Sequence, residues 1–328
     1  MIVSVVRAVH NGEEYLTEAI DSITSHTYSK MELIIVNDAS RDDTKKILDD
    51  YSDNRIKVIH LKTNMGAAYA LNLAIEHANG DWIAVHDADD LSYPNRLEEQ
   101  VNYIKKHPEL IGVGSFIECI TCPNSQYSER ELRQIEFGRN HTLDGDQIKS
   151  ALYHGCPFTH GTIMYSKKAI LKAGRYDPTL RIAYDYDLWT RLITIGPIIN
   201  VPEVLYKYRR YNESLSSKNI TRTNEELLYS FLKYIRKSCF MDNSNKPSVA
   251  IFGNLGSEKL TLPNDINVKT IFSKGDSSTI NHSLTLLKEE KIDGIIILNN
   301  LSGWTTVIRQ LQINGLELNK EFFAFYLA

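Results

Sequence analysis

The sequence predicts an α/β protein with a doubly wound mixed sheet in its first part and a small, separate α/β domain at its end. Over roughly the first hundred residues, short apolar runs alternate with segments whose apolar residues recur at helical spacing. The alternation resumes after a polar stretch at 242–247. This pattern is typical of a sheet covered by helices on both faces. At 328 residues the chain is long enough for one large and one small domain.

Strands and helices are expected to alternate through residues 1–217. The predicted strands are residues 2–6, 32–36, 56–61, 82–85, 111–117 and 204–210. Apolar residues every three or four positions predict helices at residues 11–25, 44–51, 66–78, 94–106, 167–173 and 185–195. Residues 119–142 are polar and irregular, and we expect a loop or hairpin there, over the active face.

A connecting segment at 218–245 and a small α/β domain at 246–328 are expected to follow. The apolar stripe of 223–240 predicts a helix, and its basic residues Lys233 and Arg236 suit a membrane-surface helix. Packing in a core or a dimer is the commoner fate of such a stripe. In the last domain we predict a helix at residues 283–290 and strands at residues 249–252, 271–272, 294–298 and 322–326.

The composition excludes several classes of protein. Residues are 42% hydrophobic and 24% charged, and the net charge of −4 does not suit a generic nucleic-acid binder. The apolar runs are too short to span a bilayer. The chain opens directly with a strand, so we expect a cytoplasmic protein, at the inner membrane face if it is peripheral. The four cysteines form no framework, and Cys119 and Cys122 make a lone CxxC, so we expect reduced thiols.

An acidic cluster follows the apolar run 82–85. Asp87 and Asp89 stand where a strand leaves the sheet, and in open α/β sheets ligands bind at that edge. Two carboxylates with room for phosphate oxygens and water suit Mg²⁺ or Mn²⁺ bridging a diphosphate. The alternative is that Asp89 or Asp90 caps a helix beginning near residues 93–94.

Three further positions carry polar chemistry at element ends. Asp38 follows the second strand and can bind a base or ribose, or cap a turn, but Asp42 or Asp43 can fill that capping role and leave Asp38 to bind. Gly66 precedes a helix whose first amides can face phosphate, although close packing also explains the alanines after it. Asp185 opens another helix, either as its cap or as a proton acceptor.

Taken together, these stretches resemble the family 2 glycosyltransferases, inverting enzymes of the GT-A fold. The resemblance covers residues 1–217. Its motifs occur in the family's order at residues 3–16, 36–40, 70–72, 80–81, 87–90, 94–100, 161–165, 174–177, 185–189 and 208–210. One short acidic motif is common by chance, but this many motifs in order are not.

The resemblance implies a role for each matching residue. Asp38 would contact the nucleotide base, Asp87 would lie near the ribose and the metal, Asp89 would be the main metal ligand, and Asp185 would be the catalytic base. The other donor-binding positions would be Ala8, His10, Asn11, Gly66, Asn72 and Ala88. In this mechanism the acceptor attacks the anomeric carbon from the face opposite the nucleotide, the base takes its proton, and the metal neutralises the leaving diphosphate.

The sequence departs from the family pattern at several positions. Ala8 replaces a usual proline and His10 a usual tyrosine, so His10 either stacks on the base or is a structural histidine. Tyr184 replaces an acidic residue before the base, which makes Asp187 the reserve candidate. Tyr211 replaces a late histidine, and His86 replaces an apolar residue beside the acidic motif.

The leading expectation is a metal-dependent transferase that uses Mn²⁺ or Mg²⁺ and a nucleotide-sugar donor, most commonly a UDP-sugar. Its acceptor would be a glycan or lipid-linked sugar in bacterial surface polysaccharide synthesis, or alternatively a protein. A non-catalytic sugar-nucleotide-binding scaffold is the alternative of another class. A nucleotidyltransferase would want a glycine-rich basic loop, which residues 9–12 do not supply. The C-terminal domain would serve acceptor recognition, homo-oligomerisation or docking, because residues 253–256 do not form a full dinucleotide motif.

Overall fold

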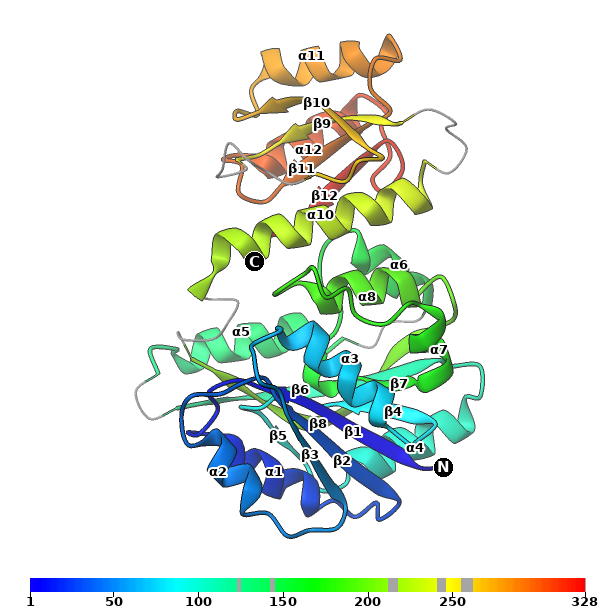
Figure 1. Cartoon of the computed structure of the whole chain (residues 1–328). Helices are drawn as coiled ribbons and strands as arrows, with labels where there is room; N and C mark the ends of the chain where they lie inside the picture. Colours follow the sequence, from blue (N-terminus) through cyan, green and yellow to red (C-terminus); the bar gives the residue numbers. More distant parts are fainter. Residues whose placement is uncertain (123–124, 142–144, 212–217, 241–245, 255–261, 328) are drawn as a thin grey trace. The chain divides into compact units, whose positions relative to one another are not determined.

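The chain folds into two compact units (Figure 1). The computed structural model describes residues 1–122, 125–141, 145–211, 218–240, 246–254 and 262–327. The first unit comprises residues 1–148 and 157–218, and the second comprises 149–156 and 219–328. The helix expected to connect two domains, α10 (Ile220–Ser238), belongs to the second unit. Residues 241–245 of the expected linker lie outside the described residues.

The first unit is built on a mixed eight-stranded sheet with the order β3-β2-β1-β4-β7-β6-β8-β5. β3, β2, β1 and β4 are parallel, β7 is antiparallel to both β4 and β6, and β8 is parallel to β6 and antiparallel to β5. The strands are β1 (Val3–Val9), β2 (Met31–Asn37), β3 (Ile56–His60), β4 (Trp82–Val85), β5 (Leu91–Ser92), β6 (Gly112–Thr121), β7 (Met164–Ser166) and β8 (Ile198–Arg210). The predicted α/β fold with a doubly wound mixed sheet is therefore confirmed.

Helices cover both faces of this sheet, as the alternating side-chain directions of its strands require. Alternate residues of β1 and β2, such as Val5 and Leu33, form one core with α1 and α4. α3 lies on the opposite face (Figure 1), where its small alanines are buried. The helices are α1 (Leu16–Thr24), α2 (Thr44–Asp49), α3 (Ala67–His77), α4 (Arg96–Lys106), α5 (Glu129–Arg139), α6 (Gly145–Leu152), η1 (His160–Thr162), α7 (Lys167–Lys172) and α8 (Tyr184–Leu192).

The parallel register brings three loops to one edge of the sheet. Val9 pairs with Asn37 and Val6 pairs with Val85, so the chain after β1, β2 and β4 leaves at the same side. The amide of His86 donates to the carbonyl of Val6 at 3.1 Å, which fixes the start of the acidic loop against β1. This edge is where open α/β sheets bind their ligands.

The segment 119–142 was expected to be irregular, and this prediction was wrong in its described part. β6 continues to Thr121, and α5 follows with a capping box between Ser128 and Glu131. None of the α5 residues is buried, so the apolar periodicity that predicts most helices is weak here. The Ser-x-x-Glu capping signature was the signal that could have found this helix.

Two other boundaries differ from the prediction for local reasons. α1 begins at Leu16 and not at residue 11, because Asn11 has a left-handed φ of 54° that a helix cannot contain. β8 begins at Ile198, six residues before the predicted strand. Its early residues pair with β6 in a register that shifts at Ser115, and that irregularity broke the strand pattern.

The second unit is a small α/β domain, which is the predicted class, and its sheet is parallel with the strand order β10-β9-β11-β12. Its elements include α12, which the prediction omitted; they are β9 (Ser248–Phe252), β10 (Asn267–Phe272), α11 (Ser277–Lys288), β11 (Gly294–Leu298), α12 (Trp304–Ile313) and β12 (Phe322–Phe325). The ring of Phe231 on α10 stacks on Phe325 with centroids 4.3 Å apart. The apolar side of α10 therefore packs in a core, which is the commoner of the two expected arrangements.

Candidate active site

Asp38 is buried at the end of β2 and holds the start of α3. Its carboxylate oxygens accept hydrogen bonds from the amides of Met65 at 2.7 Å and Gly66 at 2.8 Å. The expectation that capping by Asp42 or Asp43 would leave Asp38 free was wrong: Asp42 does accept from the Thr44 amide, at 3.1 Å, but the Asp38 carboxylate accepts from the two amides that precede α3. A contact from Asp38 to a nucleotide base would use its remaining lone pairs and stays a prediction.

His10 and Asn11 join the end of β1 to the loop after β2. The ring Nδ1 of exposed His10 lies 2.7 Å from the carbonyl oxygen of Asp38, so Nδ1 carries the proton and the ring direction is fixed. The side-chain oxygen of Asn11 accepts the Arg41 amide at 2.9 Å, and its own amide donates to Ser40 Oγ at 2.9 Å. The exposed ring of His10 can therefore offer a flat face to a base, while Ala8 lies half-buried behind it in β1.

Gly66 and Asn72 shape the approach to α3. Gly66 has a φ of +92°, a backbone conformation that favours glycine, and a Cβ there would also displace the end of the Arg181 side chain. The amide of Asn72 donates to the carbonyl of Tyr176 at 2.8 Å and accepts its N–H at 3.0 Å. Asn72 thus holds the segment around Tyr176 in place, and a direct role in donor binding stays a prediction.

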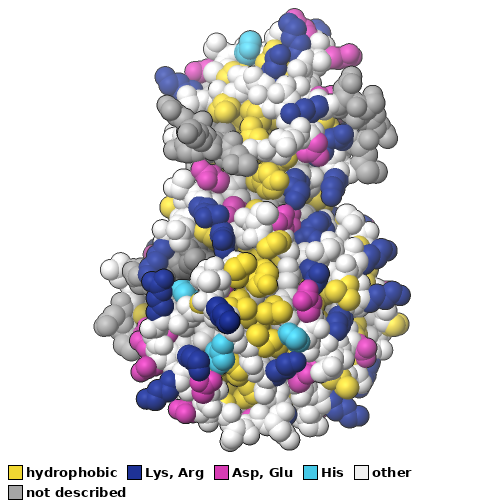
Figure 2. Space-filling view, in the orientation of Figure 1, with side chains coloured by type: hydrophobic (Ala, Val, Ile, Leu, Met, Phe, Trp, Pro, Cys, Tyr) yellow, Lys and Arg dark blue, Asp and Glu magenta, His cyan; other side chains and the backbone are white. Residues whose placement is uncertain are grey.

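The face of the first unit that carries α3 is partly apolar. Met65 is 40% exposed and Tyr69 is 38% exposed. Figure 2 shows apolar side chains gathered on this face among charged ones. Such a patch beside a polar site suits the apolar parts of a ligand.

Asp87 lies two residues after the end of β4 and is fixed from two sides. Its amide donates to the hydroxyl of Tyr206 at 3.1 Å, and its Oδ1 lies 3.2 Å from Nδ1 of His160. Burial opposes ionisation, yet His160 and the buried arginines Arg7 and Arg96 lower the pKa of Asp87. Asp87 is therefore held as a carboxylate. Ala88, next to it, is half-buried.

Asp89 and Asp90 complete the acidic loop. Asp89 Oδ2 accepts from the Tyr211 hydroxyl at 2.6 Å, and Asp90 Oδ1 accepts the Arg209 amide at 2.7 Å. Burial and then the Asp87 carboxylate raise the pKa of Asp89. The alternative that Asp89 or Asp90 caps the next helix is wrong, because α4 has Asn95 at its N-cap.

Buried positive charge lies beneath this loop. Nδ1 of His86 lies 2.6 Å from Nη2 of Arg7 and 2.8 Å from the carbonyl oxygen of Asp87, and Arg96 donates to the carbonyl of Val85 at 2.9 Å. Burial and then the two arginines lower the pKa of His86 well below its usual range, so the ring is neutral. His86, whose place in the motif is usually apolar, is therefore a neutral ring between Arg7 and the backbone of Asp87.

The two carboxylates at the start of α8 have different partners. Asp187 is buried and accepts from Nη2 and Nε of Arg191 at 2.6 and 3.0 Å, which commits it to an ion pair. Asp185 is half-buried. Within the described residues, the one hydrogen bond to its side chain comes from the amide of its neighbour Tyr186, at 2.7 Å. Burial raises the pKa of Asp185, which suits a proton acceptor. The geometry favours Asp185 over Asp187 as the base.

His160 was not singled out from the sequence, yet it lies between the carboxylates of Asp87 and Asp185. Nε2 of His160 lies 3.0 Å from the hydroxyl of Tyr176, and the ring packs edge-on against Tyr184. Asp87 and then Asp185 raise the pKa of His160 against the effect of its burial. The sequence signal was a histidine directly before the motif at residues 161–165.

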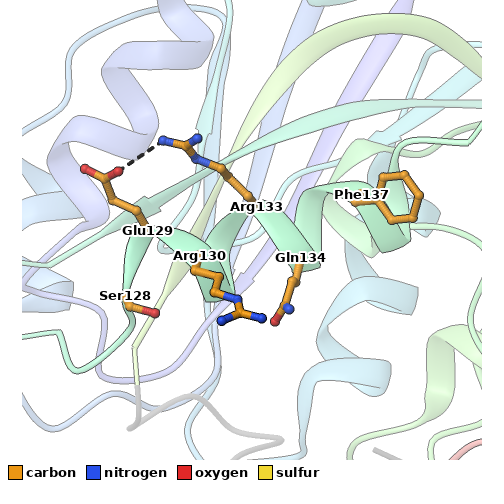
Figure 3. A pocket seen from close by; sticks show the side chains of 6 residues that line it. All are labelled: Ser128, Glu129, Arg130, Arg133, Gln134 and Phe137. Carbon is orange, nitrogen blue, oxygen red and sulfur yellow. Dashed lines mark hydrogen bonds and ion pairs between the residues drawn. The ribbon is translucent and has the colours of Figure 1, made fainter.

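A hollow of about 830 Å³ lies over the outer face of α5 (Figure 3). It is lined by Ser128, Glu129, Arg130, Arg133, Gln134 and Phe137. The Phe137 ring is 77% exposed. The C-terminal end of the same helix adjoins the site, because Arg139 donates to the carbonyl of Phe158 at 2.8 Å, two residues before His160.

Neither a ready-made metal cage nor a membrane span is found in the described part of the chain. No group of three or more histidine, cysteine, aspartate and glutamate side chains there could hold a metal ion. No helix in that part is long and apolar enough to cross a membrane. A metal at Asp87 and Asp89 would take its other ligands from the substrate and water.

The chain belongs to the glycosyltransferase family 2, because residues 4–174 match the model of "Glycosyl transferase family 2". It is 35% identical over 244 residues to "Putative glycosyltransferase EpsE" of Bacillus subtilis (strain 168), covering 71% of this chain and 83% of that one. It is 32% identical over 243 residues to "O-antigen biosynthesis glycosyltransferase WbnJ" of Escherichia coli, covering 72% and 90%.

Solved structures support the same fold. The structure of S. aureus TarS 1-349 in complex with UDP-GlcNAc aligns with a TM-score of 0.57 at 19% identity, covering 72% of this chain and 67% of that chain. The mannosyltransferase PcManGT from Pyrobaculum calidifontis, in complex with GDP-Man and Mn2+, aligns with a TM-score of 0.56 at 18% identity, covering 96% and 76%. The expected family and its GT-A fold are confirmed.

Proposed function

We propose that this chain transfers a sugar, with inversion and with a divalent metal, from a nucleotide-sugar donor to a glycan or lipid-linked acceptor. The observation that carries the proposal is the arrangement of Asp87 and Asp89 at the end of β4 with the uncommitted carboxylate of Asp185 at the start of α8, and His160 between them. An intact set of carboxylates at both positions favours an enzyme over a scaffold that only binds sugar nucleotides.

The proposed step breaks one bond and forms one. The acceptor hydroxyl oxygen attacks the anomeric carbon and forms the new glycosidic bond, while its proton passes to Asp185. The bond between the anomeric carbon and the phosphate oxygen breaks, and its electron pair leaves with the nucleoside diphosphate. Because burial raises the pKa of Asp185, that carboxylate is a better proton acceptor than an exposed aspartate.

The residues of the acidic loop fit a divalent cation. Asp87 and Asp89 offer carboxylate oxygens, and Mg²⁺ or Mn²⁺ sites in such enzymes take only one or two carboxylates beside substrate phosphates and water. Burial and then the Asp87 carboxylate raise the pKa of Asp89, which is consistent with two neighbouring acidic groups that a cation would stabilise. When bound, the metal would neutralise charge on the leaving diphosphate.

The donor proposal rests on the edge formed by the loops after β1 and β2. The fixed, exposed ring of His10 provides a flat face for a base, and Asp38 lies beside it. The TarS and PcManGT structures contain UDP-GlcNAc and GDP-Man respectively, so nucleotide sugars are the donors of structurally similar proteins. We propose a UDP-sugar as the donor of this chain.

The acceptor proposal rests on the α5 hollow and on one relative. Arg139 connects α5 to the segment that carries His160, so an acceptor lying along α5 would reach the site. The exposed Phe137 ring and Arg130 suit stacking on a sugar ring and contact with an anionic group. The name of WbnJ favours a surface-polysaccharide acceptor over a protein acceptor.

The test compares two carboxylate variants on the same helix. Asp185→Asn should retain nucleotide-sugar binding and lose transfer by about a hundredfold or more, because a general base contributes roughly that factor. Asp187→Asn is the matched variant; it should lose stability and keep the turnover of its folded fraction. Equal turnover by Asp185→Asn and the unaltered chain would show that Asp185 is not the base.

A further inference from the structure

His160 connects parts of the site that are far apart in the sequence. It is buried at the first position of η1, with Nδ1 3.2 Å from Oδ1 of Asp87 and Nε2 3.0 Å from the hydroxyl of Tyr176. Its ring also packs edge-on against Tyr184, with centroids 5.5 Å apart. Tyr184 directly precedes Asp185. One imidazole thus contacts the donor side of the site and the residue next to the base.

The hydrogen bonds decide how the ring is oriented. An ionised carboxylate can only accept, so the proton on Nδ1 points to Asp87. Tyr176 then holds Nε2 from the other side, and Tyr176 is itself fixed by the amide of Asn72. A histidine held at both nitrogens has one ring direction, and the group that it contacts takes a matching direction.

The backbone that carries His160 is held as firmly as its ring. The Thr162 hydroxyl donates to the carbonyl of Thr159 at 2.7 Å, and Gln100 donates to the carbonyl of Thr162 at 2.8 Å. A Cβ at Gly161 would lie 2.0 Å from the Tyr206 hydroxyl, the same hydroxyl that accepts the Asp87 amide. Asp87 is therefore fixed through its main chain by Tyr206 and through its side chain by His160.

We propose that His160 is a positioning residue, which aims the Asp87 carboxylate at the donor and keeps the wall beside Asp185 in place. It acts through Asp87 and through the aromatic rings of Tyr176 and Tyr184, without contact to the reacting atoms. The proposal rests on the proposed function, since the orientation of Asp87 matters for a bound nucleotide sugar. It adds a residue that the acidic motif and the base do not include.

Two conservative variants separate the two hydrogen bonds of His160. In His160→Asn the side-chain amide reaches about as far as Nδ1 and can still donate to Asp87. In His160→Gln the amide reaches about as far as Nε2 and can contact Tyr176, but it leaves Asp87 without its donor. His107→Gln, which alters a half-exposed histidine stacked on Tyr103, is the matched control for loss of an imidazole.

The first readout is calorimetric binding of UDP in the presence of Mn²⁺. His160→Gln should weaken binding by about tenfold, because a hydrogen bond to a charged group is lost, whereas His160→Asn should stay within about threefold. Transfer should show the same order in KM for the donor, with a smaller change in kcat. Equal losses in the Asn and Gln variants would overturn the proposal, because a merely structural imidazole would not distinguish them.

The second readout needs neither nucleotide nor metal. A double-mutant cycle between His160→Gln and Asp87→Asn, read as unfolding equilibria in urea, should show coupling of roughly threefold or more. Additive effects would overturn the proposed contact. If coupling is present but the unaltered chain binds neither UDP nor any other nucleoside diphosphate, the proposed function fails while the His160–Asp87 contact stands.

Discussion

Replacing Asp38 by alanine tests whether this residue supports the fold as well as the nucleotide. The structure gives its carboxylate two backbone partners, the amides of Met65 and Gly66, before any ligand is considered. Asp38→Ala removes both acceptors at once and leaves the two amides that precede α3 without their partner. The variant should therefore be less stable in the absence of nucleotide.

The size of the effect follows from the exposure of those two amides. A hydrogen bond to a charged group contributes about 1.5–3 kcal/mol when its partner cannot turn to water. Met65 is exposed and Gly66 is half-buried, so water can replace part of what is lost. The cost should fall near that of a removed helix cap, about 2 kcal/mol in the free energy of unfolding.

Urea denaturation followed by far-UV circular dichroism measures this cost. Asp43→Ala is the matched control, because Asp43 precedes α2 without a side-chain capping bond and should cost less than about 0.5 kcal/mol. UDP affinity is measured on both variants. If Asp38→Ala weakened UDP binding but unfolded at the same urea concentration as the unaltered chain, the role of Asp38 in holding the start of α3 would be refuted.

Three further predictions concern the fold around the site. Burial lowers the pKa of His26 from 6.5 to about 3, so the unfolded chain binds the proton at a higher pH than the folded chain does, and the free energy of unfolding falls as the pH drops below 6.5. Relative to the unaltered chain, the unfolding free energy of His26→Leu should therefore rise by about 2 kcal/mol between pH 7 and pH 5. Gly161→Ala should abolish UDP binding while the chain still folds, because its Cβ would meet the Tyr206 hydroxyl at 2.0 Å, and retained affinity would contradict this geometry. Asp187→Asn should lower the unfolding free energy by about 2 kcal/mol by breaking the partly buried pair with Arg191, and an unchanged urea midpoint would contradict that role.

Most of the sheet could be predicted because its strands are short apolar runs between clear breaks. β4 and β11 were predicted with the correct limits, since each is a continuous buried run bounded by polar residues. α5 could not be predicted from periodicity, because it buries none of its residues and is attached by polar contacts. One of these is Glu136, which accepts the amide of Cys119 at 2.7 Å, and Leu132 and Ile135 add apolar contacts to the sheet.

The acidic motif could be read from the sequence, but the partners of its members could not. His160 is 73 positions from Asp87, and Asn72 is 104 positions from Tyr176. Such pairs meet only through the sheet register and the turns, which single-sequence patterns do not encode. Asp38 shows the same limit, since its carboxylate accepts the amide of Gly66, 28 positions later and just before α3.

The most direct test of the proposed function is calorimetric binding of a panel of nucleotide sugars, with and without Mn²⁺, to the unaltered chain and to Asp89→Ala. We expect binding of one donor that requires the metal, slow release of its nucleoside diphosphate, and loss of both in the variant. Metal-independent binding, or equal binding by Asp89→Ala, would contradict the assignment of Asp89 and the metal-dependent mechanism built on it.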